Sequence, residues 1–316
     1  MGTPEFAVET LRALVENGYN VVAVVTQPDK PVGRHQDTLQ PPAVKQYAQS
    51  RGLPVLQPVR MKDPRFVEEL KGYGADLQVV VAFRMLPEAV WAMPRFGTFN
   101  VHAALLPQYR GAAPINWAII NGERQTGVTT FFLDHDIDTG RIIMQEPFEI
   151  KDDYDVEDVY DGLMKLGAGV ALKTVDKIIE GDGHVDSLPQ KRLIPTDGRL
   201  HAAPKIFKDT CRVRLDGTAC RVRNFVRGLS PYPGTWLEMK SHDGKASVLK
   251  VFKTTLTGIP CNGKEPGTIM VYDGRLLTAT ADCWLQLDEI QLSGKKRMAA
   301  KDFLNGVRNI EDYKLF

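Results

Sequence analysis

The stretch 3–25, TPEFAVETLRALVENGYNVVAVV, sets the expected fold because it joins an amphipathic helix to a buried strand. Pro4 and Glu5 suit a first helical turn, and the apolar residues after them recur at helical spacing until Gly18. The run Val21–Val25 is apolar throughout and almost entirely β-branched, which is typical of a parallel strand buried on both faces. The stretch therefore predicts a helix–strand unit of an α/β sheet.

The same alternation continues along the first half of the chain. Helices are expected near 42–51 and 63–72, and strands near 54–56 and 77–82. This order predicts a Rossmann-like α/β domain with a mostly parallel sheet. A helix of such a fold should follow a strand, so we expect that the first strand is missing upstream of Gly2 and that Met1 is an internal methionine of the natural protein.

The second half predicts further strands, one long helix and a second domain. Strands near 127–133 and 141–150 flank an acidic loop, and an apolar stripe predicts a helix over 156–180. Short alternating segments in the last hundred residues predict a small open β-barrel of OB-like type. The expected division is a catalytic domain at 1–188, a linker at 189–205 and the barrel at 206–316.

Composition limits the class of protein. The chain has 316 residues, 43% of them hydrophobic and 25% charged, as in ordinary globular proteins. It contains no apolar run of membrane-spanning length and no secretory signal pattern, so we expect a cytoplasmic protein without a membrane partner. Its four cysteines have no CxxC spacing, which predicts reduced thiols and no metal site.

Charge differs between the two parts of the chain. Residues 206–316 hold 18 Lys and Arg against 12 Asp and Glu, or +6; the rest holds 22 against 27, or −5, which gives the overall +1. A basic carboxy-terminal part favours a polyanionic partner, although a solvated surface explains the same charges.

Three polar groups stand out as candidates for chemistry. Asn100 and His102 occupy positions i and i+2 of an expected strand and so share one face. The run LLPQYRGAAP at 105–114 is apolar and then irregular, which favours a pocket lining, and Asp138 precedes a Thr-Gly turn. An amide donor, an imidazole and a carboxylate together suit acyl transfer without a metal. The alternative is that these groups are satisfied polar residues of the core.

Seven blocks of sequence carry a resemblance to the methionyl-tRNA formyltransferase family. They are GTPEF at 2–6, TQPDKP at 26–31, NVH at 100–102 with LLPQYRGAAP at 105–114, IDTG at 137–140, PYPGTW at 231–236, PGTI at 266–269 and SGKK at 293–296. The resemblance implies formyl transfer from 10-formyltetrahydrofolate to the α-amine of initiator methionyl-tRNA.

The resemblance also implies roles for the three polar groups. Asn100 would donate a hydrogen bond to the oxyanion, and His102 would stabilise that oxyanion and protonate the leaving folate nitrogen. Asp138 would either orient His102 or accept the proton of the amine, and the sequence leaves both roles open.

Two sets of binding residues follow from the same resemblance. The folate pocket would include Arg84, Met85, Leu86, Ala104, Leu105, Leu106 and Pro107, the first three through their backbone. The tRNA contacts would include Arg34, Lys191, Arg192, Lys205, Lys295 and Lys296. The chain departs from the family at His35-Gln36-Asp37, which replace a lysine-rich continuation, and at Asp136, where the family more often has glycine. The protein is expected to be a monomer.

Other functions remain as alternatives. A sister formyltransferase that acts on an amino sugar or another small amine would carry the same three polar groups. A nucleotide-dependent oxidoreductase is disfavoured because no GxGxxG motif follows a strand. A non-catalytic RNA-binding protein with the same fold is the third alternative.

Overall fold

The computed structural model describes residues 1–32, 38–307 and 309–316, which form two compact units. The first unit contains Met1–Gly111, Thr126–Glu149 and Tyr160–Ala202, and the second contains Ala112–Gln125, Ile150–Val159 and Ala203–Phe316. The second unit therefore takes two segments from the first half of the chain, in addition to the predicted barrel. The predicted domain limits at 188 and 206 stay predictions.

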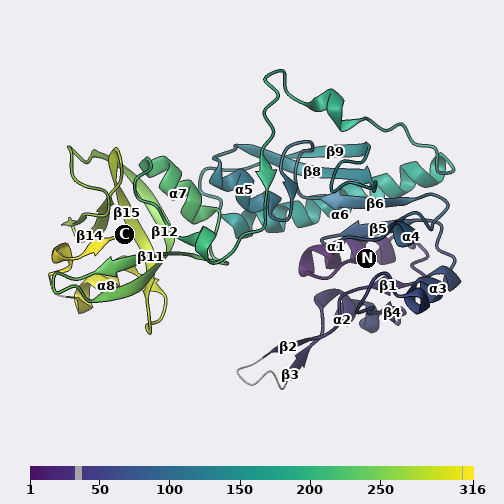
Figure 1. Ribbon diagram of the computed structural model, residues 1–316, viewed down its shortest axis with the longest axis horizontal. Coiled ribbons are helices and arrows are strands. Elements are labelled where there is room, and N and C mark those ends of the chain that lie inside the picture. The colour runs from purple at the N-terminus through teal and green to yellow at the C-terminus, as the bar shows by residue number, and fades with distance from the viewer. Residues whose placement is uncertain (33–37, 308) are drawn as a thin grey trace. The chain divides into compact units, whose positions relative to one another are not determined.

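The first unit is an α/β structure, as predicted from the helix–strand alternation (Figure 1). Its helical elements are α1 (Glu5–Glu16), α2 (Ala43–Ser50), α3 (Pro64–Gly72), α4 (Glu88–Trp91), most of α6 (Val156–Glu180) and the 3-10 turn η1 (Gln190–Leu193). Its strands are β1 (Val24–Val25), β2 (Lys30–Val32), β3 (Thr38–Gln40), β4 (Val55–Leu56), β5 (Gln78–Val81), β6 (Thr98–His102), β8 (Gln125–Phe132) and β9 (Ile142–Glu149); β7 (Arg110–Gly111) is a two-residue strand.

These strands form one four-stranded sheet, β5-β6-β8-β9, and separate two-stranded pairs that include β1-β4. β1 pairs with β4 and β5 pairs with β6, both in parallel, whereas β6 pairs with β8 in antiparallel register. β9 lies beside β8. The register sets His102 opposite Thr129 and Asn100 opposite Phe131, and this fixes which residues surround the candidate site.

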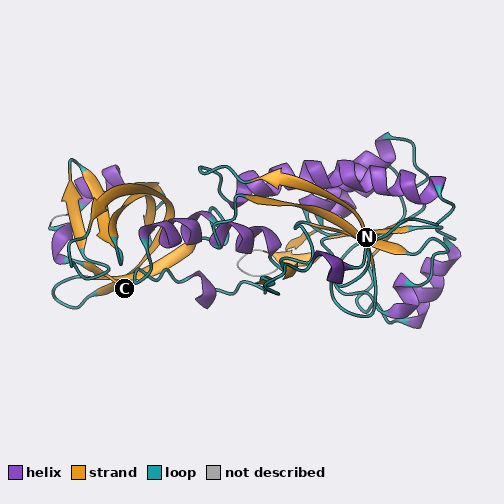
Figure 2. Ribbon diagram, turned by 90° about the horizontal axis from the view of Figure 1, so that it is seen from above, coloured by secondary structure: helices purple, strands orange, loops and turns teal. Residues whose placement is uncertain are grey.

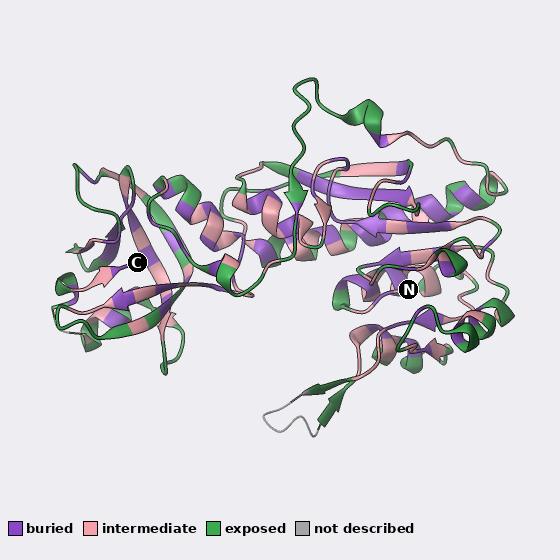
Figure 3. Ribbon diagram, in the orientation of Figure 1, coloured by how far each residue is buried: buried purple, intermediate pink, exposed green. Residues whose placement is uncertain are grey.

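The core of the first unit lies around these strands (Figure 3). Phe99 and Val101 of β6 are buried, as are Val128 and Phe131 of β8. Helix α6 packs along the sheet (Figure 2): a Cβ atom at Gly162 would lie 2.3 Å from the ring of Phe148, so only glycine allows this approach. None of the helices in the described ranges is long and apolar enough to cross a bilayer.

The second unit is built on a curled antiparallel sheet, in agreement with the predicted barrel. The strands run in the order β13-β14-β15-β12-β11-β17, with β16 beside β15. The bounds are β11 (Thr235–Lys240), β12 (Ala246–Pro260), β13 (Ile269–Tyr272), β14 (Arg275–Ala279), β15 (Cys283–Leu292), β16 (Met298–Ala299) and β17 (Lys314–Leu315). Its helical elements are α5 (Pro114–Ile120), η2 (Asp209–Cys211), α7 (Ala219–Arg227), α8 (Ala300–Gly306) and η3 (Ile310–Asp312). The two-residue strand β10 (Ala202–Ala203) comes between α5 and η2 in the chain.

The two ends of this sheet approach each other at Gly267. An isolated bridge joins Thr268 to Lys314, and the N–H of Leu315 donates to the carbonyl of Gly267 at 2.9 Å. Gly267 has a φ of +86°, and a Cβ there would lie 1.9 Å from the carbonyl oxygen of Leu315. The PGTI block singled out in the sequence therefore closes the barrel.

Candidate active site

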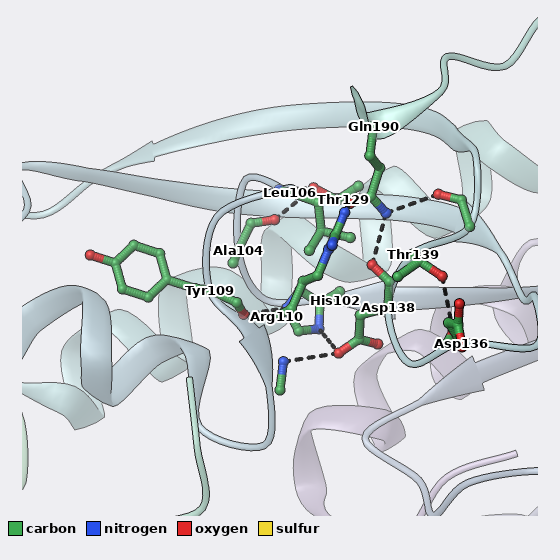
Figure 4. Close-up of polar contacts among 12 residues, drawn as sticks. His102, Ala104, Leu106, Tyr109, Arg110, Thr129, Asp136, Asp138, Thr139 and Gln190 are labelled. Carbon is green, nitrogen blue, oxygen red and sulfur yellow. Dashed lines mark hydrogen bonds and ion pairs between the residues drawn. The ribbon is translucent and has the colours of Figure 1, made fainter. Parts of the chain in front are cut away.

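His102 ends β6 and is held from one side by a backbone carbonyl. Its side chain is 6% exposed, and its Nε2 lies 2.9 Å from the carbonyl oxygen of Tyr109. Because a carbonyl only accepts hydrogen bonds, Nε2 is the donor. In the neutral ring, Nδ1 is then free of its proton, and this nitrogen faces Asp138 (Figure 4).

Asp138 lies close enough to His102 to act on its charge. Its Oδ2 is 4.0 Å from Nδ1 of His102 and accepts a hydrogen bond from the N–H of Gly111 at 3.0 Å. The separation of 4.0 Å exceeds a direct hydrogen bond but leaves an ion pair effective in a partly buried site. Asn100 is only partly buried and shares the strand face of His102, so all three predicted groups occur in the first unit.

The turn that carries Asp138 contains a residue with positive φ and a tightly packed glycine. Asp138 has a φ of +54°, and a Cβ at Gly140 would lie 1.7 Å from the carbonyl oxygen of Phe132. The side-chain amide of Gln190 donates to the carbonyls of Asp138 and Gly140 at 2.8 and 2.9 Å. The IDTG block is therefore a shaped turn that depends on glycine and on a distant amide.

Gln190 is a buried residue of the candidate site that the sequence did not reveal. It is 3% exposed, although it lies in the segment predicted as a linker. Its Oε1 accepts from Nε and Nη2 of Arg110 at 3.0 and 2.6 Å. One side chain thus joins the predicted pocket loop to the turn of Asp138. A single glutamine among prolines and basic residues gives no local signal of such contacts.

Thr129 organises the start of the predicted folate loop. Its hydroxyl donates to the carbonyl of Ala104 at 2.6 Å and accepts from the N–H of Leu106 at 3.1 Å. Nε2 of Gln145 donates to the same hydroxyl at 2.9 Å and to the carbonyl of Leu106 at 2.8 Å. The side chain of Leu106 packs into the core with Phe131, so this part of the loop is rigidly held. Thr126 and Thr130 lie on the same strand, so the sequence alone does not single out Thr129.

The end of the loop is held by the predicted linker. Tyr109 has a φ of +60°; its N–H bonds to the carbonyl of His201 at 2.6 Å, and its ring stacks on the His201 ring with centroids 5.6 Å apart. Gln108 exchanges hydrogen bonds with Arg199 and His201 at 3.0 and 2.8 Å. Part of the predicted linker therefore belongs to the wall of the site.

The remaining predicted folate residues differ in how far their side chains are exposed. Met85 is 72% exposed, whereas Leu86 packs into the core with Val25 and Leu56. The guanidinium of Arg84 donates to the carbonyls of Pro58 and Val59, and its burial lowers the pKa of that group. The side chains of Leu86 and Arg84 are therefore engaged within the protein, and their role in folate binding stays a prediction. Ala104 and Pro107 are buried and Leu105 is partly buried.

The predicted tRNA contacts are dispersed. Arg34 lies outside the described residues, as does the departure at 35–37. Lys191 and Arg192 are exposed on η1 of the first unit, and Lys205, Lys295 and Lys296 are exposed in the second. In the described part of the chain, His, Cys, Asp and Glu residues form no cluster of metal-binding size.

Comparison with known proteins relates both units to one family. A family profile described as formyl transferase matches residues 1–175, and one described as the formyl transferase C-terminal domain matches 205–308. Methionyl-tRNA formyltransferase of Parabacteroides distasonis is 55% identical over 99% of this chain and 96% of its own length. That of Bacteroides fragilis is 51% identical over 100% of this chain and 96% of its own.

Solved structures show the same fold at lower identity. The sugar 3N-formyl transferase WlaRD has a TM-score of 0.63 and 17% identity, over 93% of this chain and 97% of that chain. An N-formyltransferase from Helicobacter canadensis, solved with folinic acid and dTDP-3-aminofucose, has a TM-score of 0.60 and 18% identity, over 90% and 96%.

Proposed function

This chain belongs to the formyl transferase family, and from that premise we propose that it transfers the formyl group of 10-formyltetrahydrofolate to the α-amine of initiator methionyl-tRNA. The product is formylmethionyl-tRNA for translation initiation, which places the enzyme in the cytoplasm. The observation that carries the proposal is the approach of Asp138 to within 4.0 Å of His102, beside Asn100 on the same strand face.

The reaction begins with attack of the neutral amine on the formyl carbon. A free α-amine titrates near pH ~8, so a neutral fraction is available near neutral pH. Attack forms the new N–C bond and places negative charge on the formyl oxygen. The side-chain N–H of Asn100 donates to this oxyanion and cannot lose its proton, so it stabilises charge at every working pH.

Collapse of the intermediate then breaks the bond between carbon and the folate nitrogen. The leaving nitrogen gains a proton and the attacking amine loses one, so the step is neutral overall. His102 supplies the proton to the folate nitrogen, and the Asp138 carboxylate lies 4.0 Å from Nδ1 of His102, where it faces the ring from the side opposite Tyr109. Asp138 also accepts the amine proton in this scheme, and the two roles are compatible within one turnover.

Each partner has a surface suited to it. The loop 103–107 offers buried apolar walls and backbone groups for the flat pterin of the folate. The excess of basic residues over 206–316, which gives +6, suits phosphate contacts that position the acceptor end of the tRNA. The proposal includes a monomeric enzyme that needs no metal ion.

The test combines the purified protein, initiator tRNA charged with methionine, and 10-formyltetrahydrofolate. Formylmethionyl-tRNA should form, and the His102→Ala variant should lose most of the rate while keeping its fold by circular dichroism. A parallel reaction with an amino sugar nucleotide examines the sister activity. Formylation of the sugar but not of the tRNA would overturn the proposal.

A further inference from the structure

The segment 199–202, which we name the strap, runs beside the predicted pocket loop within the first unit. The N–H of Tyr109 donates to the carbonyl of His201 at 2.6 Å. The N–H of His201 donates to Oε1 of Gln108 at 2.8 Å, and Nε2 of Gln108 donates to the carbonyl of Arg199 at 3.0 Å. Three hydrogen bonds therefore join the strap to two successive residues of the loop.

Tyr109 needs this support because of its backbone conformation. Its φ of +60° lies in the left-handed region, which residues with a side chain rarely adopt unless their surroundings hold them there. Besides the backbone hydrogen bond, the ring of His201 stacks on the ring of Tyr109, with 13° between the planes and 5.6 Å between the centroids. Tyr109 is buried whereas His201 is exposed, so the imidazole covers the Tyr109 ring from solvent.

The conformation of Tyr109 decides where its carbonyl points. That carbonyl accepts a hydrogen bond from Nε2 of His102 at 2.9 Å, while the Tyr109 ring points away from His102 (Figure 4). The bond keeps a proton on Nε2 of His102 and leaves Nδ1 toward Asp138. Rotation of the Tyr109 carbonyl away from His102 would therefore release both the orientation and the tautomer of the imidazole.

We propose that His201 is a positioning residue for His102. The ring and the backbone of His201 hold Tyr109 in the left-handed conformation, and the carbonyl of Tyr109 in turn holds Nε2 of His102. The imidazole of His201 lies against a ring that points away from His102, so it acts through Tyr109 and touches no reacting group. The kinetic part of this inference rests on the proposed formyl transfer, whereas the hydrogen bond of His102 is observable without substrates.

The kinetic experiment compares His201→Ala with His201→Phe in the full chain. Alanine removes the stacked ring, whereas phenylalanine keeps a flat ring against Tyr109 but carries no nitrogen that can titrate or bind. His201→Ala should lower kcat at least tenfold and leave the KM for methionyl-tRNA and for 10-formyltetrahydrofolate within about twofold. His201→Phe should restore kcat to within about threefold of the unmutated protein.

A matched control and a direct readout accompany the kinetics. His184 is another exposed histidine of the first unit, and His184→Ala should leave kcat unchanged. Nitrogen NMR of protein labelled at histidine reads the tautomer of His102 without substrates, and the His102→Ala variant identifies its signals. Neutral His102 should carry its proton on Nε2 alone in the unmutated protein and in His201→Phe. In His201→Ala both tautomers should appear, because the acceptor carbonyl is no longer held in place.

The outcomes separate this role from the alternatives. An unchanged tautomer of His102 in His201→Ala would overturn the proposal, whether or not kcat falls, because His201 would then not act through that hydrogen bond. Equal losses of kcat in His201→Phe and His201→Ala would also overturn it, since the imidazole nitrogens and not the stacked ring would matter. If the unmutated protein formed no formylmethionyl-tRNA, the proposed function would fail, and the tautomer comparison would still decide whether His201 positions His102.

Discussion

Replacement of Thr129 by valine tests how the predicted folate loop is held. Valine has almost the same shape as threonine but lacks the hydroxyl. That hydroxyl is fully buried and makes three hydrogen bonds: to the carbonyl of Ala104, from the N–H of Leu106, and from the amide of Gln145. The change therefore removes hydrogen bonds without opening a cavity.

The expected cost follows from the groups that lose their partner. Gln145 keeps its bond to the carbonyl of Leu106, so two buried backbone groups are left, at Ala104 and Leu106. Each such group costs ~1–3 kcal/mol when unsatisfied. The added methyl group returns ~0.8 kcal/mol of burial. The net loss should be about 3 kcal/mol, which is roughly a hundredfold in the equilibrium between held and open loop.

The same strand provides a matched control. Thr126 is 3% exposed, and within the described residues its hydroxyl has no hydrogen-bond partner. Thr126→Val removes a buried polar group that gains nothing from its surroundings, so stability should stay unchanged or rise by about 1 kcal/mol. Two identical substitutions, three residues apart on β8, should thus differ in their effect on stability: Thr129→Val should lower it, and Thr126→Val should not.

Hydrogen exchange of residues 103–109 and the thermal midpoint measure both variants. Thr129→Val should lower the midpoint, speed exchange in this loop, and reduce formylation, because Tyr109 would no longer fix His102. Equal midpoints for Thr129→Val and Thr126→Val would refute the reasoning. The hydrogen bonds of Thr129 would then contribute nothing measurable to stability.

Three further predictions concern the rest of the site and the barrel. Asp138→Asn should lower kcat by ~10²–10⁴ with little change in KM, measured by single-turnover formylation, because the amide removes the negative charge 4.0 Å from Nδ1 of His102. Gln190→Glu keeps the acceptor for Arg110 but loses the donors to the turn of Asp138, so kcat should fall at least tenfold. Gln190→Asn keeps an amide donor and should lower kcat less than Gln190→Glu does. Asp282 accepts the N–H of Ala219 at 2.8 Å, which holds the pKa of that carboxyl below its usual range. Its contribution is therefore complete above its unfolded pKa of ~3.9 and is lost as the pH falls through its lowered folded-state pKa, so Asp282→Asn should be destabilising at pH 7 and should approach the unmutated protein in strong acid in urea unfolding.

Local periodicity predicted the long regular elements well. The apolar stripe over 156–180 gave the limits of α6, and β8 lies within two residues of the predicted 127–133. These elements bury a continuous face, so the pattern of apolar residues is dictated along their whole length. The three polar groups were also predicted, because a strand fixes the face that Asn100 and His102 share.

Where the prediction differed from the structure, a distant segment decides the outcome. The run 21–25 has the composition of a full strand, yet only Val24–Val25 is one, where it pairs with Val55–Leu56 of β4. Among the short segments after residue 206, residues 212–215 contribute only an isolated bridge between Arg212 and Trp236. Strand formation needs a partner, and composition does not show whether one is present.

The loop 103–111 links the two ionisable groups of the site. Its carbonyl at Tyr109 fixes Nε2 of His102, and its N–H at Gly111 fixes Oδ2 of Asp138. Displacement of this one loop therefore changes the separation of His102 and Asp138 from both sides at once. Thr129 anchors the start of the loop, and Gln190 anchors its end through Arg110. Loss of either anchor should thus affect the same distance, and combining Thr129→Val with Gln190→Glu should reduce kcat by less than the product of the single effects. Independent effects would mean that the loop does not move as one piece.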